Sequence, residues 1–161
     1  VAQSLGADKP TLAKEIGWSS LIFTTTVCVL VGALVWIFRY PLLDLYAPSA
    51  DVRSVAIPLF LFIAFYQIFD ALQVTSAFIL RGYRVAFWPM WIYAISLWGV
   101  GLFGGYILGF NLTGNVPEIL QGAQGFWFAN SLSLAIAATF LIMLFKRTAK
   151  RFEKEHPPVE V

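Results

Sequence analysis

The apolar residues of this chain fall into four long blocks, separated by short segments that hold most of its charged and helix-breaking residues. Each block is long enough to cross a bilayer as a helix, because a hydrocarbon core about 30 Å thick needs roughly 20 helical residues. The blocks do not alternate apolar and polar positions as half-buried strands do. The pattern therefore predicts an all-α, polytopic membrane protein with four transmembrane helices, at about residues 17–38, 52–80, 85–110 and 123–145.

The segments outside these blocks predict how the spans are connected. Residues 1–16 are expected to be a cytoplasmic connector, with Asp8 as the N-cap of the helix that enters the first span. Residues 81–84 form so short a link that the second and third spans are expected to be antiparallel neighbours. Residues 146–161 are expected to be a cytoplasmic tail that begins as a short helical extension.

The third and fourth spans carry residues that favour close helix packing. Gly101 and Gly105 are spaced so that another helix backbone can approach them closely. The third span also has an aromatic load, which fits an interfacial belt and packing, or a cavity for flat cations. Its members are Trp88, Trp91, Tyr93 and Trp98. The polar residues of the fourth span are expected to form hydrogen bonds between helices; they are Asn130, Ser131 and Ser133.

The composition places the chain among membrane proteins. Of its 161 residues 59% are hydrophobic and only 12% are charged, whereas soluble domains carry about 25% charged residues. The net charge of +2 is too small to indicate nucleic-acid binding. Cys28 and His156 are the only residues of their kinds, so the sequence proposes no transition-metal site.

The basic residues predict the orientation of the spans. Two of them, Arg39 and Arg53, lie on one side, and nine lie on the other. Since loops rich in Lys and Arg stay in the cytoplasm, both ends of the chain are expected to be cytoplasmic. The nine residues on that side are Lys9, Lys14, Arg81, Arg84, Lys146, Arg147, Lys150, Arg151 and Lys154.

The second span contains a polar stripe. Asp70 carries a full charge when ionised, and insertion of such a residue at a helix centre costs about 2.5–3.5 kcal/mol. At 100° per residue, Tyr66, Gln67 and Gln73 lie within about 60° of Asp70 on one face. Intramembrane acids mark ion and substrate paths, so we interpret the stripe as such a path. A polar patch that only joins neighbouring helices is the structural alternative.

These residues leave more than one class of function open. A transporter would use Asp70 to bind a cation. A four-helix membrane scaffold or assembly subunit would instead pair Asp70 with a basic residue of a partner protein. An intramembrane enzyme is disfavoured, because the spans offer one acid, one isolated cysteine and no histidine.

Three segments resemble the multidrug and toxic compound extrusion (MATE) family in its NorM-like bacterial branch. Residues 1–7, VAQSLGA, resemble the end of the family's eighth helix, and residues 122–134, GAQGFWFANSLSL, resemble the opening of its twelfth. Residues 65–83, FYQIFDALQVTSAFILRGY, resemble the tenth helix and are the most specific of the three. The chain does not open with Met, and we expect it to be the C-terminal piece of a longer polypeptide.

The resemblance implies helices nine to twelve, part of the six-helix C-terminal lobe of a twelve-helix transporter. It implies a multi-pass protein of the bacterial inner membrane that exports cationic amphipathic drugs and toxic organic compounds in exchange for Na⁺ or H⁺. The partners implied are the preceding eight helices and the lipid bilayer. Asp70 matches the family's cation-binding acid and is a possible Na⁺ ligand; Tyr66, Gln67 and Gln73 would be secondary ligands or would orient it. No cofactor is expected besides the coupling ion.

Overall fold

The computed structural model describes residues 1–46 and 50–156, with the side chains at positions 46, 50–52, 54, 55, 58 and 61 outside the described part. The described residues form helices and no strand, and four helices are long and apolar enough to cross a membrane. The all-α prediction with four candidate spans is therefore confirmed. The elements are α1 (Ala2–Gly6), α2 (Pro10–Ile37), α3 (Arg39–Tyr46), α4 (Ala50–Gly82), α5 (Phe87–Tyr93), the π-helix η1 (Ala94–Phe103), α6 (Gly104–Gly109), the 3₁₀ turn η2 (Glu118–Leu120) and α7 (Ala123–Glu155).

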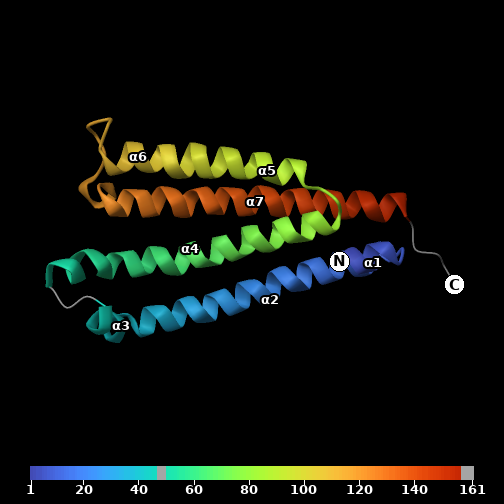
Figure 1. Ribbon diagram of the computed structural model, residues 1–161, viewed down its shortest axis with the longest axis horizontal. Helices are drawn as coiled ribbons and strands as arrows, with labels where there is room; N and C mark the ends of the chain where they lie inside the picture. Colours follow the sequence, from blue (N-terminus) through green and yellow to red (C-terminus); the bar gives the residue numbers. More distant parts are fainter. Residues whose placement is uncertain (47–49, 157–161) are drawn as a thin grey trace.

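The long helices lie side by side, with α7 between α4 and the α5–η1–α6 rod and with α2 on the far side of α4 (Figure 1). The second and third spans are antiparallel, but α7 separates them along most of their length, so the prediction that they are neighbours was wrong. The reason is that α7 has small residues facing two directions. Ala129 and Ser133 let η1 and α6 approach, and Ala138 lies buried in the same helix.

The third span is not one uniform α-helix. Its middle, Ala94–Phe103, widens into a π-helix between α5 and α6. The glycine prediction is confirmed: a Cβ on Gly101 would lie 2.9 Å from Ser133 Oγ, and a Cβ on Gly105 would lie 2.8 Å from the Phe126 ring. The missing side chains therefore allow η1 and α6 to pack directly on α7.

The first long helix begins one residue later than an Asp8 cap requires. Lys9 occupies the N-cap position without a side-chain hydrogen bond, and Pro10 is the first helical residue. Asp8 has a φ of 53°, in the left-handed region. The turn after α1 thus uses Asp8 for its backbone conformation, so the prediction that Asp8 caps the helix was wrong. Proline suits the first helical position, since the N–H that it lacks would have no helical partner there.

The best-packed core lies where α2, α4 and α7 converge, at the end of the molecule that holds α1 and the last turns of α7 (Figure 1). The centroid of the Phe145 ring lies 5.4 Å from that of Trp18 in α2 and 6.0 Å from that of Tyr83, which follows α4. A Lys14–Glu153 ion pair of 2.9 Å joins α2 to α7 at the same end. From this core α4 extends to the opposite end of the molecule, and the polar stripe belongs to α4 (Figure 1).

Tyr83 is buried in this core, but its hydroxyl forms no hydrogen bond there with a described residue. The residue is 2% exposed, and its hydroxyl has no hydrogen-bond partner among the described residues. Burial, with a smaller contribution from Glu153, raises the pKa of Tyr83 to about 12. The raised pKa means that the neutral phenol is favoured in the folded protein. The contribution of the neutral Tyr83 phenol to folding stability is therefore fully present below pH 10 and is lost as the pH rises towards 12.

We expect Tyr83→Phe to leave the protein at least as stable as the wild type. A buried polar group without a partner costs about 1–3 kcal/mol, and the substitution removes that group while it keeps the ring. Thermal unfolding of the purified full-length protein in detergent, at pH 7 and at pH 11, would measure the effect. Between pH 7 and pH 11 the stability of the variant should fall by less than that of the wild type. A clearly lower stability of the variant at pH 7 would show that the hydroxyl has a partner in the intact protein.

Candidate functional site

The four residues of the predicted stripe lie on α4, beyond the packed core. Gln73 is buried at 6% exposure, whereas Tyr66, Gln67 and Asp70 are half-buried. The structure joins Asp70 and Gln73 directly: the side-chain nitrogen Nε2 of Gln73 donates a hydrogen bond of 3.0 Å to Asp70 Oδ1. Gln67 forms no hydrogen bond with another described side chain. The stripe is thus a carboxylate held by one amide, with a phenol one turn before it.

The helix α5 adds a residue to this arrangement. The hydroxyl of Tyr93 donates a hydrogen bond of 3.2 Å to the main-chain oxygen of Gln73. The Gln73 side-chain oxygen Oε1 is buried and accepts no hydrogen bond from the described residues. Tyr93 therefore anchors the turn of α4 that carries Gln73, and Gln73 in turn orients Asp70. The sequence pointed to Tyr93 only as part of the aromatic load of its span.

The helix α7 contributes an aromatic neighbour that the sequence did not assign to the site. The rings of Tyr66 and Trp127 meet edge to face, with centroids 5.7 Å apart and planes at 75°. Such pairs contribute about 0.5–1.5 kcal/mol beyond the area that they bury. Trp127 therefore restricts the orientation of Tyr66, which lies one helical turn before Asp70 on the same face of α4.

Ser131 follows Trp127 by one turn, as Asp70 follows Tyr66. Both α4 and α7 run from the end near η2 towards the packed core, so the two helices are parallel and lie side by side (Figure 1). The step of one turn on each helix places Ser131 at the depth of Asp70. Its hydroxyl is buried and has no partner among the described residues. Ser133, by contrast, donates to the oxygen of Asn130 in its own helix, so the expected interhelical bond was wrong for Ser133.

A groove of about 310 Å³ lies between the π-helix η1 and α7, and Trp127 is part of its lining. Segments of π-helix are rare and are found frequently at functional sites. Trp127 thus lines this groove and also contacts Tyr66 of the polar stripe. The groove is lined by Leu97, Gly101, Leu102, Phe126, Trp127 and Asn130.

The oxygen atoms around Asp70 define what the site can bind. A carboxylate, an amide oxygen and hydroxyl groups are ligands that hard cations prefer. In the described part of the chain no group of three or more His, Cys, Asp and Glu side chains could hold a metal ion. A cation at Asp70 would therefore need amide, hydroxyl or aromatic neighbours besides the single acid.

The comparisons with known proteins agree with this architecture. The MatE family model matches residues 1–107. The chain is 36% identical over 151 residues to the probable multidrug resistance protein NorM of Aromatoleum aromaticum, covering 94% of this chain and 32% of that protein. It is 31% identical over 156 residues to the multidrug resistance protein PmpM of Pseudomonas aeruginosa, covering 97% and 32%. The chain thus spans about a third of the length of these relatives.

A solved structure shows the same fold. The crystal structure of the eukaryotic MATE transporter AtDTX14 matches with a TM-score of 0.77 at 18% identity, over 94% of this chain and 34% of that one. The family resemblance of the three sequence segments is confirmed by the family match and by the bacterial relatives. The chain therefore belongs to the MatE family and is part of a larger multi-pass membrane protein.

Proposed function

We propose that this chain is the C-terminal third of a cation-coupled antiporter that exports cationic drugs and toxic organic compounds. The observation that carries the proposal is Asp70, a half-buried carboxylate within a candidate membrane helix, held by Gln73 beside the Tyr66–Trp127 pair. The names of the bacterial relatives, which are multidrug resistance proteins, support the substrate class.

The proposed mechanism follows from the fact that one carboxylate can hold one positive charge at a time. Asp70 is neutralised by a proton, by Na⁺ with further oxygen ligands, or by a cationic drug. If these occupancies exclude one another, binding of the ion weakens drug binding by the same factor as the drug weakens ion binding. A membrane potential then supplies about 2.3 kcal/mol per charge for each 100 mV. Ion entry can thereby drive drug release.

The scaffold alternative is less well supported. It requires a basic residue of a partner protein opposite Asp70, whereas the bacterial relatives bear the names of multidrug resistance proteins, which favour transport. We also propose that the protein lies in the bacterial inner membrane with its C-terminus in the cytoplasm, because nine of the eleven Lys and Arg residues lie on that side of the spans.

Efflux from vesicles tests the proposed function. The full-length transporter is reconstituted, the vesicles are loaded with ethidium, and a Na⁺ gradient or a pH gradient is applied in turn. We expect efflux under at least one gradient and its loss when an ionophore dissipates that gradient. Vesicles without protein are the control. Coupled export would be refuted if the efflux rate were the same with and without either gradient, or if no cationic dye were exported.

We expect Trp127→Leu to weaken the apparent affinity for the coupling ion by about two- to tenfold, because the variant removes a ring contact of about 0.5–1.5 kcal/mol. Trp127→Phe keeps a ring at this position and should recover most of the affinity. The measurement is the dependence of efflux on ion concentration, which separates affinity from maximal rate. Trp98→Leu is the matched control, since Trp98 is 71% exposed on the neighbouring η1. Equal losses in both tryptophan variants would contradict a role of Trp127 in orienting Tyr66.

A further inference from the structure

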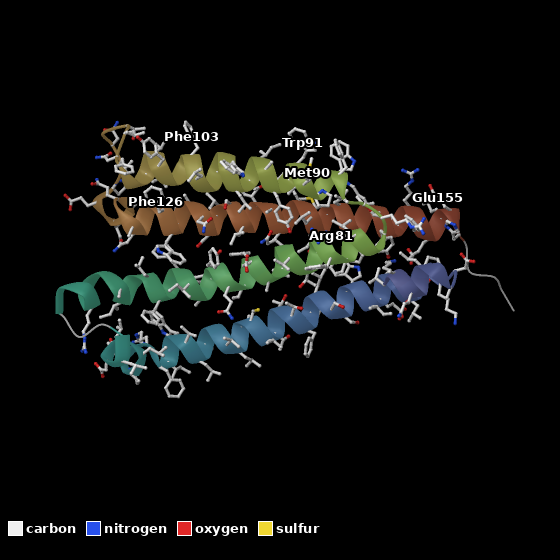
Figure 2. The ribbon with its side chains drawn as sticks, in the orientation of Figure 1. Arg81, Met90, Trp91, Phe103, Phe126 and Glu155 are labelled. Atoms are coloured by element: carbon white, nitrogen blue, oxygen red, sulfur yellow. The ribbon has the colours of Figure 1, made fainter. Side chains whose placement is uncertain are left out.

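A second groove lies at the opposite end of α7 from the Asp70 site. It has a volume of about 390 Å³ and runs between the start of α5 and the last turns of α7. Figure 2 labels Trp91 on α5 and Glu155 at the end of α7, the two helices that frame this part of the molecule. The residues that matter for its chemistry are Val85, Trp88, Leu144, Arg147, Arg151 and Glu155.

One half of this groove is positively charged. Arg147 is exposed and forms no ion pair with a described acidic residue. Arg151 is also exposed, and its Nε donates a hydrogen bond of 2.7 Å to Glu155 Oε1. Glu155 thereby occupies one edge of the Arg151 guanidinium and forms part of the groove lining. The two guanidinium groups follow each other by one turn on α7, a spacing that lets both contact a single anion.

The other half of the groove is apolar and lies where the chain would leave the membrane. Trp88 is 61% exposed, and it belongs to an edge-to-face cluster in which Phe87 lies 5.8 Å from Trp88 and 6.3 Å from Trp91. Exposed Trp side chains gather at membrane–water interfaces. On α7 the apolar run ends at Phe145, and charged residues begin with Lys146. The groove therefore crosses from apolar to basic surface at the depth of lipid headgroups.

We propose that this groove binds one anionic phospholipid of the surrounding membrane. Its phosphate contacts Arg147 and Arg151, and the upper part of an acyl chain lies along Trp88 and Leu144. Arginine suits this role because its planar guanidinium binds phosphate in a bidentate manner. Basic pockets between membrane helices on the cytoplasmic side are suited to anionic headgroups. The apolar half favours a whole lipid over free phosphate, which would leave Trp88 and Leu144 uncovered. The site is separate from the proposed transport function.

Lipid binding by the full-length transporter tests the proposal. The protein is purified in detergent, and retention of phosphatidylglycerol and of phosphatidylcholine is measured by native mass spectrometry. We expect the wild type to retain phosphatidylglycerol in preference. The double variant R147Q/R151Q should lower its apparent affinity by about tenfold or more, because two basic contacts to an anionic headgroup are lost.

The matched control is K146Q/K150Q, which removes the same charge from exposed positions of the same helix turns but outside the groove. We expect it to change the affinity by less than about threefold. Equal losses in the two double variants would overturn the site, since they would indicate diffuse attraction. No loss in either, or displacement of the lipid by millimolar inorganic phosphate, would overturn it as well. Thermal unfolding of both variants verifies that they fold.

Discussion

Replacing Asp70 with asparagine is expected to abolish ion-driven efflux by the full-length transporter while its insertion into the membrane is unchanged. Asparagine keeps the size of the side chain and can still accept the hydrogen bond from Gln73. It cannot carry a negative charge, so it cannot be neutralised in turn by an ion and a drug. Removing an acid from a membrane helix also lowers the cost of insertion, so a folding defect is not the expected cause of the loss.

The measurement compares ethidium efflux from vesicles that contain equal amounts of inserted wild type and variant. Asp44→Asn is the matched control, because Asp44 is an exposed acid on α3 whose partner is Arg53, at 2.7 Å. It should transport as the wild type does. Normal coupled efflux by Asp70→Asn would remove Asp70 from the mechanism and favour the purely structural interpretation of the stripe. Loss of assembly, with little inserted protein, would favour the scaffold.

Much of the α4 side of the site could be predicted from the sequence, because it depends on local periodicity. Once residues 52–80 are one helix, the angle of 100° per residue places Tyr66, Asp70 and Gln73 on one face. A single charge within a long apolar block is also visible without coordinates. The hydrogen bond from Gln73 to Asp70 spans three residues of the same helix, and it follows from that geometry.

The α7 side could not be predicted, because it depends on which helices pack together. Trp127 and Tyr66 are 61 positions apart, and only the placement of α7 against α4 brings their rings together. The short link at residues 81–84 suggested that the third span would occupy that place. Its glycines instead allow the span to pack on the far side of α7, and the π-helical stretch in it has no periodic signal of its own. A sequence pattern reports the faces of a helix, but not which neighbour covers each face.

The packing of α6 on the first turn of α7 makes Gly125 the glycine least able to accept a side chain. A Cβ at this position would collide with the main-chain oxygen of Leu120, and would lie 3.1 Å from the main-chain nitrogen of Gly109 and from Leu108 Cβ. Two of these three atoms belong to the backbone, which cannot rotate away as a side chain can. A hydrogen bond of 2.9 Å from Gly122 N to Gly109 O also ties the segments together, so separating them loses a main-chain contact.

We therefore expect Gly125→Ala to destabilise the full-length transporter by about 1–3 kcal/mol or more, the cost of inserting atoms into a packed interior. Thermal unfolding in detergent measures this, and Gly99→Ala is the matched control. A Cβ at Gly99 meets nothing within 4 Å, so that variant should match or exceed the wild type. If both variants unfold at the same temperature as the wild type, the contact between α6 and α7 is not tight in the intact protein. Trp127 follows Gly125 by two residues, so a shift of this turn should also weaken the contact between Trp127 and Tyr66. The Gly125→Ala protein that remains folded should then need a higher ion concentration for half-maximal efflux.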